Sequence, residues 1–287
     1  MFTVDGYTKQ LAIIGNPVDH SFSPEMHNYI SEITNNNYVY TAWCVNDIQA
    51  SMQAVKALNI SGVNVTAPFK EKVIPYLDEV DEQAQIFGSV NTVVNQNGRL
   101  KGYNTDAEGF YMSLLKNGID IRDRQILIIG AGGVVRPVVT KFIYEGAKSI
   151  TVVNRNEKRV LDLKAELYKT TKFKIETQIN DADFDVVINT TSAGMAPQKD
   201  ILPTAAISSV SNLDFINDNT AVVDMIYNPR ETLFLKEAKQ RGAKTVNGLG
   251  MLIYQGILAY ELFTGVSLPK NIYEMIKENV FDNKEWD

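Results

Sequence analysis

The chain has 287 residues, 45% hydrophobic and 22% charged, with a formal net charge of −6. This length predicts two domains, and the acidic balance argues against nucleic acid as the main partner. The single Cys44 excludes an internal disulfide, and neither a membrane-length apolar run nor a signal-peptide pattern is present, so we expect a cytoplasmic protein.

The first predicted elements are a strand at residues 11–14 and a helix that begins at Ser23-Pro24. A hydroxyl cap followed by proline is a typical helix start, so Ser23 could be a cap and nothing more. Capping leaves Ser21 unexplained. Two hydroxyls two residues apart, beside the free N–H groups of a helix start, are suited to bind a carboxylate.

Two histidines flank this serine pair, His20 and His27. We interpret both as ordinary surface or capping residues. No grouping of His, Cys, Asp and Glu here has metal-ligand spacing, so we expect no metal.

A strand at residues 38–43, a helix at 48–58 and a strand at 62–65 form a βαβ unit of a parallel sheet. Pro68 cannot extend a central strand, so the chain turns there and brings Lys70 to the carboxyl end of the strand. Open α/β sheets bind ligands at that end. The alternative is that Lys70 is a solvated lysine and Thr66 belongs to a polar strand face.

Residues 71–87 are predicted to be helical with a break near Pro75, and residues 88–94 form a strand. Asn97-Gly98 is a strong hairpin signal. The return strand leads to a helix that starts at Asp106. That carboxylate could simply cap the helix or could take part in a site.

The second domain starts near Arg124, with a continuous apolar run at 125–129 that is typical of a strand buried on both faces. The glycine turn at residues 130–133 follows and opens a helix, as in dinucleotide-binding proteins. The alternative is an ordinary tight turn. Val135 occupies the third glycine position and Pro137 lies in the following helix, which we expect to loosen or kink it.

The next strand, residues 149–153, ends at a basic turn that contains Arg155 and Arg159. An NAD site would place an acidic residue there to bind the ribose hydroxyls, whereas guanidinium groups suit a 2′-phosphate. We therefore predict NADP(H), with a solvated basic turn as the alternative.

Two further strands, within residues 185–195 and 221–229, end in small or polar residues where a nicotinamide ring would lie. A helix then begins near Asn247. Gln255 lies off its apolar face and could be a solvated residue. We expect the terminal helices to pack on the first domain.

Taken together, these motifs resemble the shikimate dehydrogenase family along nearly the whole chain. The resemblance rests on Ser21-Phe22-Ser23-Pro24, His27-Asn28, Asn64-Val65-Thr66-Ala67-Pro68-Phe69-Lys70, Asn91-Thr92, Asn104-Thr105-Asp106, the glycine turn, Asn154-Arg155, Asp224-Met225-Ile226-Tyr227-Asn228-Pro229 and Gln255. It implies NADPH-dependent reduction of 3-dehydroshikimate to shikimate, in aromatic amino-acid biosynthesis.

The resemblance also implies residue roles. Ser21 and Ser23 would hold the substrate carboxylate, while Lys70 and Asp106 would face the reacting carbonyl. Lys70 would then donate a proton, with Asp106 orienting it. The other substrate-binding residues would be Thr66, Asn91, Tyr227 and Gln255. The cofactor-binding set is Gly130, Ala131, Gly132, Gly133, Val134, Asn154, Arg155, Arg159, Met225 and Gly248.

We expect an α/β protein with a mostly parallel substrate domain at residues 1–106, completed by helices at about 249–287. A linking helix at 107–123 leads to a Rossmann-type NADP-binding domain at 124–248, with a cleft between the domains. Partners would be the small-molecule substrate, without nucleic acid or membrane, in a monomer or homodimer. Two alternatives stay open: a quinate/shikimate dehydrogenase that uses NAD, and a catalytically silent sensor of shikimate-pathway metabolites.

Overall fold

A computed structural model describes residues 4–179, 183–207, 210, 212–282 and 284. The chain divides into two compact units. The first is formed by Met1–Gly109 with Ile253–Lys284, and the second by Phe110–Leu252. The boundaries between them fall within two helices, α4 (Asp106–Lys116) and α8 (Leu249–Thr264).

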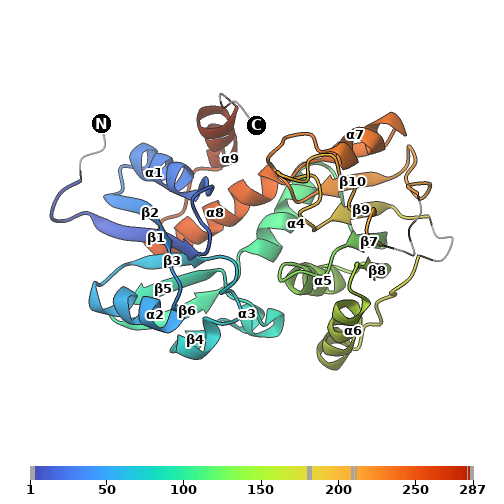
Figure 1. The fold of residues 1–287 in the computed structure, drawn as a ribbon. Helices are drawn as coiled ribbons and strands as arrows, with labels where there is room; N and C mark the ends of the chain where they lie inside the picture. Colours follow the sequence, from blue (N-terminus) through green and yellow to red (C-terminus); the bar gives the residue numbers. More distant parts are fainter. Residues whose placement is uncertain (1–3, 180–182, 208–209, 211, 283, 285–287) are drawn as a thin grey trace. The chain divides into compact units, whose positions relative to one another are not determined.

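The first unit contains a six-stranded sheet in the order β2-β1-β3-β5-β6-β4 (Figure 1). Its strands are β1 (Lys9–Gly15), β2 (Tyr38–Cys44), β3 (Gly62–Val65), β4 (Glu79–Val80), β5 (Thr92–Gln96) and β6 (Arg99–Tyr103). β1 is parallel to β2 and β3, whereas β5 is antiparallel to both β3 and β6. The end of β3, the start of β5 and the end of β6 therefore meet at one edge of the sheet.

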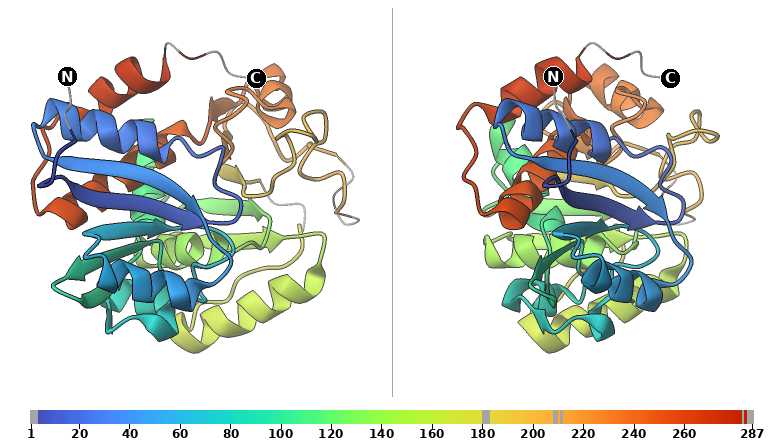
Figure 2. Two further views of the ribbon diagram at one scale, coloured as in Figure 1. Left: turned by 60° about the vertical axis from the view of Figure 1, so that its left-hand side comes forward. Right: turned by 90° about the vertical axis from the view of Figure 1, so that its left-hand side faces the viewer.

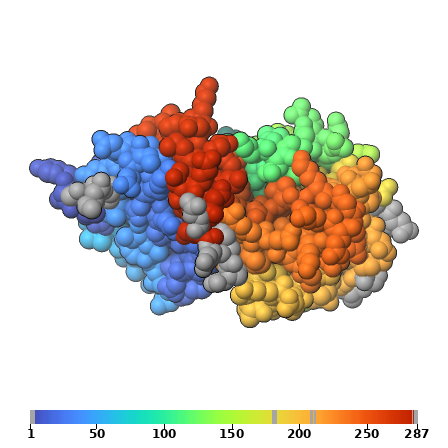
Figure 3. Space-filling view, turned by 90° about the horizontal axis from the view of Figure 1, so that it is seen from above, coloured from blue at the N-terminus to red at the C-terminus, as the bar shows by residue number. Residues whose placement is uncertain are grey.

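Several helices pack buried apolar side chains against this sheet. Those of the first unit are α1 (Ser23–Ile33), α2 (Ile48–Ala57), α3 (Glu82–Phe87), α9 (Ile272–Ile276), the 3-10 turn η1 (Ile74–Tyr76) and the π-helical turn η2 (Lys277–Phe281). Figure 2 shows α1 lying along β1 and β2. The C-terminal α9 and η2 contact α1, so residues from both ends of the chain form one surface (Figure 3).

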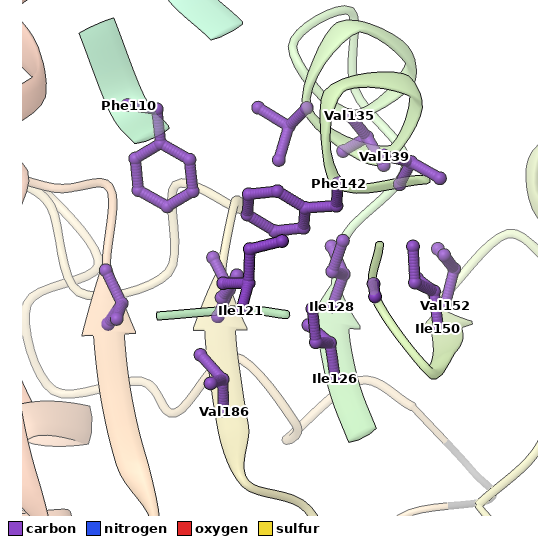
Figure 4. Close-up of a cluster of buried hydrophobic side chains, with 14 of the residues drawn as sticks. Phe110, Ile121, Ile126, Ile128, Val135, Val139, Phe142, Ile150, Val152 and Val186 are labelled. Atoms are coloured by element: carbon purple, nitrogen blue, oxygen red, sulfur yellow. The ribbon is translucent and has the colours of Figure 1, made fainter. Parts of the chain in front are cut away.

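The second unit contains five parallel strands in the order β11-β10-β9-β7-β8. They are β7 (Gln125–Ile129), β8 (Ser149–Val153), β9 (Val186–Asn189), β10 (Ala221–Asp224) and β11 (Lys244–Val246), with helices α5 (Val135–Tyr144), α6 (Glu157–Thr171) and α7 (Leu233–Gln240). Side chains of β7, β8 and α5, among them Ile126, Ile128 and Phe142, form one buried core (Figure 4). The strand order reverses between β7 and β9, which is where open α/β sheets bind ligands.

These two sheets confirm the predicted α/β class, the parallel βαβ unit and the strand, glycine turn and helix of the second unit. The predicted hairpin turn is also present. Both Asn97 and Gly98 have positive φ, 54° and 86°, as a type I′ turn requires.

The helical prediction for residues 71–87 was wrong in part. The segment holds η1, the two-residue strand β4 and only then α3. The backbone N–H groups of Asp78 and Asp81 donate to carbonyls of β6, so this stretch adds a strand to the sheet edge.

Pro137 does not interrupt α5, contrary to the expected kink. The helix begins at Val135, which places Pro137 in its first turn. The N–H groups of a first turn have no intrahelical acceptor, so a proline there removes no helical hydrogen bond.

Candidate active site

Lys70 lies just beyond the carboxyl end of β3, in a tightly held turn. The Phe69 N–H donates to the Thr66 carbonyl at 2.9 Å, and the Phe69 ring is buried in the core. The Lys70 carbonyl accepts a hydrogen bond from the Val90 N–H at 2.8 Å, just before β5. The backbone of Lys70 is thus fixed at the sheet edge where β3, β5 and β6 meet.

Asp106 is the first residue of α4, at the end of the hairpin formed by β5 and β6. Its role is not helix capping, because the side-chain oxygen of Asn104 accepts from the Asp106 N–H at 3.1 Å. The carboxylate is free to accept the Lys70 ammonium, with Nζ 2.7 Å from Oδ2. The Lys70 side chain is 25% exposed and that of Asp106 is 8% exposed, so the pair is reachable from solvent mainly at the lysine.

Asn91 holds the other oxygen of this carboxylate. Its side-chain nitrogen donates to Asp106 Oδ1 at 2.9 Å and to Thr105 Oγ1 at 2.9 Å. Its side-chain oxygen accepts from the Thr105 N–H at 2.8 Å. Because a backbone N–H can only donate, this contact fixes which end of the Asn91 amide faces Asp106.

The two candidate carboxylate-binding serines lie at the start of α1. The helix begins at Ser23 with Phe22 as the N-cap residue and no side-chain cap, so the capping interpretation of Ser23 was wrong. The Ser21 hydroxyl instead accepts from the Ser23 N–H at 3.2 Å. Ser23 is only 6% exposed, and its hydroxyl lies near the Tyr40 phenol.

Two further predicted residues flank these groups within the first unit. Thr66 directly follows β3 and is half-buried, with its N–H donating to the Ile14 carbonyl. The backbone of Gln255 packs against Gly109, one turn after Asp106. A Cβ at Gly109 would lie 2.6 Å from the Gln255 nitrogen, so α4 and α8 approach as closely as glycine allows there.

Four buried polar residues joined to this site were not among the predicted site residues: Tyr40, Asn64, Thr92 and Thr105. The Tyr40 hydroxyl donates to the Asn64 side-chain oxygen at 2.7 Å, and the Asn64 nitrogen donates to Thr92 Oγ1 at 3.1 Å. Asn64, Thr92 and Thr105 belong to motifs that carry the family resemblance, but no role was assigned to them, and Tyr40 had no such signal. The side-chain partners of Asn64 come from other strands.

His27 is fully buried, so the surface or capping interpretation was wrong for it; His20 is exposed, as expected. The His27 ring stacks on Tyr40 with centroids 4.2 Å apart. Neither ring nitrogen has a hydrogen-bond partner among the described residues. Burial lowers the pKa of His27 to about 3, so the ring is neutral.

The glycine turn of the second unit fits a bound pyrophosphate. Gly130 has a φ of +119°, and a Cβ there would collide with Thr190 Oγ1 on the neighbouring loop, so only glycine fits. Gly132 and Gly133 are exposed. In the described part of the chain, their N–H groups and that of Ala131 have no acceptor. These groups precede α5 at the point where the strand order reverses.

The basic turn after β8 lies at the same edge of this sheet. Arg155 lies in this turn and Arg159 in the first turn of α6. Both are exposed, and neither forms an ion pair with any residue that the structure describes. Asn154 donates to the Asn156 carbonyl at 3.0 Å, which shapes the turn. Two uncompensated guanidinium groups at a strand end suit a phosphate dianion.

Met225 and Gly248 lie side by side after β10 and before α8. A Cβ at Gly248 would collide with the Met225 carbonyl, and the Gly248 N–H donates to the Ile226 carbonyl at 2.9 Å. Tyr227, the remaining predicted substrate residue, belongs to this same loop in the second unit, and burial raises the pKa of its phenol.

Asp224, at the end of β10, supports this loop. Its carboxylate is fully buried and accepts from Asn189, the Ile226 N–H and the Thr232 hydroxyl. Burial nevertheless raises the pKa of Asp224 to about 6, against the lowering effect of these donors.

No group of three or more His, Cys, Asp or Glu side chains in the described residues is arranged to hold a metal ion. A search of the same residues finds no helix with the length and apolar character that a membrane crossing needs.

Family models match three successive segments of the chain. Residues 13–93 match the shikimate dehydrogenase substrate binding domain, residues 113–237 the shikimate / quinate 5-dehydrogenase model, and residues 248–272 the shikimate 5′-dehydrogenase C-terminal domain. The chain is 39% identical over 276 residues to the shikimate dehydrogenase (NADP(+)) of Carboxydothermus hydrogenoformans, covering 94% of this chain and 96% of that protein.

Two solved structures are also similar. A shikimate dehydrogenase in complex with NADP+ has 38% identity and a TM-score of 0.89, covering 98% of this chain and 97% of that one. The shikimate 5-dehydrogenase of Thermus thermophilus, in complex with NADP(H) and shikimate, has 32% identity and a TM-score of 0.83, covering 95% of this chain and 100% of that one. With this degree of identity over almost its full length, the chain belongs to the shikimate dehydrogenase family.

Proposed function

We propose that this protein catalyses the reversible NADPH-dependent reduction of 3-dehydroshikimate to shikimate, with Lys70 and Asp106 at the reacting carbonyl. The observation that carries the proposal is the 2.7 Å contact between the Lys70 ammonium and the Asp106 carboxylate at the edge where β3, β5 and β6 meet. The first unit acts as the substrate domain, completed by the C-terminal helices, and the second as the NADP domain.

Lys70 serves as the proton donor in the reductive direction. When bound, the cofactor supplies a hydride to the carbonyl carbon, and negative charge grows on the carbonyl oxygen. An ammonium at that oxygen stabilises the charge and transfers a proton to it, leaving a neutral amine that regains a proton from solvent. The partial exposure of the Lys70 side chain provides that route. In the oxidative direction, the amine accepts the alcohol proton.

Asp106 and Asn91 orient the proton donor and the substrate. The Asp106 carboxylate holds the ammonium through Oδ2 while Asn91 holds Oδ1, so both oxygens are fixed. Such fixed partners lower the cost of bringing the donor to the reacting oxygen. Asp106 is therefore an orienting group that also accepts from a substrate hydroxyl.

Ser21 and Ser23 bind the substrate carboxylate at the other end of the site, and Thr66, Gln255 and Tyr227 contact the carboxylate or ring hydroxyls. Hydroxyl donors leave the bound carboxylate ionised without adding a fixed positive charge. The substrate is thus held at one end by neutral donors and met at the other by the Lys70 ammonium.

The cofactor residues present a matching set of groups in the second unit. Gly130, Ala131, Gly132, Gly133 and Val134 would face the pyrophosphate, Asn154, Arg155 and Arg159 the 2′-phosphate, and Met225 and Gly248 the nicotinamide. The exposed arginines favour NADP(H) over NAD, which argues against an NAD-dependent quinate/shikimate dehydrogenase.

A catalytically silent sensor would not require an intact proton-donor pair, whereas here Lys70 and Asp106 are both present and in contact. We place the reaction in the cytoplasm, since the single Cys44 is unpaired and exposed, as suits a reducing compartment.

The direct test follows the loss of NADPH absorbance when 3-dehydroshikimate is added to the purified protein. We expect rapid oxidation of NADPH and much slower oxidation of NADH. Ligand-dependent thermal stabilisation without any NADPH oxidation would refute the enzyme and favour the sensor. A parallel assay of shikimate and quinate oxidation decides between the two substrates.

A further inference from the structure

We propose that Tyr40 is a positioning residue that links the Ser23 end of the site to the Lys70–Asp106 pair through a line of buried hydrogen bonds. This inference rests on the proposed function for its catalytic meaning, but the line itself consists of contacts within the first unit. Tyr40 touches neither member of the pair.

The line runs through Tyr40, Asn64, Thr92 and Asn91 to Asp106, and all five residues are at most 6% exposed. The line starts at the Tyr40 phenol, which lies near the Ser23 hydroxyl and donates to Asn64 at 2.7 Å. Asn64 donates to Thr92 at 3.1 Å, Thr92 donates to the Asn91 side-chain oxygen at 3.0 Å, and Asn91 donates to Asp106 at 2.9 Å.

The donors in this line all point the same way. The Asn64 nitrogen donates to the Asn91 backbone carbonyl at 3.1 Å, and a carbonyl only accepts, so the Asn64 oxygen must face Tyr40. The Tyr40 hydroxyl is therefore committed to donating to Asn64. The line ends at the Asp106 carboxylate, which accepts from both sides. Aligned donors of this kind polarise one another.

Three residues of α1 hold Tyr40 in place. The Asn28 side chain donates to the Tyr40 carbonyl at 2.9 Å and accepts from the Tyr40 N–H at 2.8 Å. The buried His27 ring stacks on the Tyr40 ring, and Ser23 lies near the Tyr40 hydroxyl. β2 is an edge strand, so Asn28 supplies the backbone partners that a further strand would otherwise provide. This arrangement gives a use to His27 and Asn28, which the sequence motif left without a role.

A purely local role for Tyr40 and a positioning role predict different kinetics. If Tyr40 only supported Ser23, its loss would weaken substrate binding and leave the chemical step unchanged. If it fixes Asn64, and thereby Asn91 and Asp106, its loss slows the chemical step although no ligand-contacting residue is altered.

The experiment compares Tyr40→Phe, Thr92→Val and the double variant in single-turnover oxidation of NADPH at saturating 3-dehydroshikimate. Each single variant should slow the reaction on the order of tenfold. The double variant should be no slower than either single variant, because both substitutions interrupt the same line of hydrogen bonds. Tyr38→Phe is the matched control: it lies two residues earlier on β2, is 9% exposed, and its hydroxyl bonds no described residue.

An unchanged single-turnover rate in Tyr40→Phe, a double variant slowed by the product of the single effects, or an equal loss in Tyr38→Phe would each overturn the inference. A wild-type protein without NADPH oxidation would instead refute the proposed function. An NMR measurement, which needs no substrate, tests the line of hydrogen bonds in that case as well. The side-chain amide NMR signal of Asn91 should shift in Tyr40→Phe and not in Tyr38→Phe, and an unshifted signal overturns the line whatever the activity. Thr92→Val removes a different hydrogen bond of the same line. Both the kinetic and the NMR measurement can therefore be made with it if Tyr40→Phe folds poorly.

Discussion

The Lys70 ammonium and the Asp106 carboxylate, 36 residues apart in sequence, lie 2.7 Å from one another in the first unit. The antiparallel pairing of β5 with β3 and β6 produces this contact, since it returns the chain to the edge at which β3 ended. A lysine after one strand and an aspartate after another thus become one proton-handling pair. The predictions below test this pair, the cofactor site and the two buried groups with strongly shifted pKa values.

Removing Arg155 and Arg159, the two arginines at the end of β8 and the start of α6, should weaken the preference for NADPH. In Arg155→Ser/Arg159→Ser, the KM for NADPH should rise on the order of tenfold or more, since each charge-assisted contact to a phosphate contributes about 1 kcal/mol at an exposed site. The KM for NADH should change little. Steady-state kinetics with both cofactors measures this.

The control for the arginine variant is Lys158→Ser. Lys158 lies beside Arg159 in the first turn of α6 but is already paired with Asp162 at 2.8 Å, so its loss should leave the cofactor preference unchanged. Comparable catalytic efficiency of the wild-type protein with NADH and NADPH would show that the arginines do not select the cofactor.

His27 should make the protein sensitive to acid. Its folded pKa is about 3, below the ordinary histidine pKa of 6.5, so the unfolded state binds the proton more readily. The stability this provides is complete above pH 6.5 and is lost as the pH falls towards 3. Between pH 7 and 4.5, the wild type should lose about 2–3 kcal/mol of unfolding free energy more than His27→Phe.

Denaturant unfolding at the two pH values measures this difference. Phe keeps the ring that stacks on Tyr40 and does not titrate. The exposed His20 provides the control, since His20→Gln should lose as much stability as the wild type. Equal losses in the wild type and His27→Phe would show that His27 is protonated in the folded protein.

The contribution of Asp224 to the free energy of unfolding should depend on pH with the opposite sign. Burial raises its folded pKa to about 6 from 3.8, so the folded state binds the proton more tightly than the unfolded state. That contribution is complete below pH 3.8 and is lost as the pH rises through 6. Relative to Asp224→Asn, the wild type should therefore lose about 2–3 kcal/mol of unfolding free energy between pH 4 and 7.

The Asp224 comparison uses the same unfolding measurement at several pH values. Asp218→Asn, on the exposed surface of the same unit, should run parallel to the wild type at every pH. If the stability difference between the wild type and Asp224→Asn did not vary with pH, the Asp224 carboxylate would have the same pKa folded and unfolded.

Local patterns in the sequence sufficed for much of the fold. The predicted strand at 62–65, the apolar run at β7 and the Asn97-Gly98 turn each depend on neighbours in the chain, and all three elements are present. The strand β4 was missed because two residues carry no periodicity. Its pairing with β6 is decided by the sheet edge rather than by its own sequence.

The buried parts of the site could not be predicted in this way. The burial of His27 depends on Tyr40, and that of Asn64 on residues of β2 and β5, none of them neighbours in sequence. Ser23 and Asp106 were ambiguous for a different reason: capping and ligand binding favour the same residue types at the same helix position. The structure resolves the ambiguity, because Ser21 accepts from the Ser23 N–H and Asn104 accepts from the Asp106 N–H. Ser21 and Asn104, rather than Ser23 and Asp106, therefore bind these N–H groups at the helix starts.

Single-turnover oxidation of NADPH with 3-dehydroshikimate by Lys70→Ala, beside the exposed control Lys72→Ala, tests the proton-donor role of Lys70 most directly. The account predicts that Lys70→Ala slows the chemical step by about 10²–10⁴-fold while substrate affinity changes modestly, and that Lys72→Ala behaves like the wild type. A rate near wild type in a folded Lys70→Ala protein would contradict it.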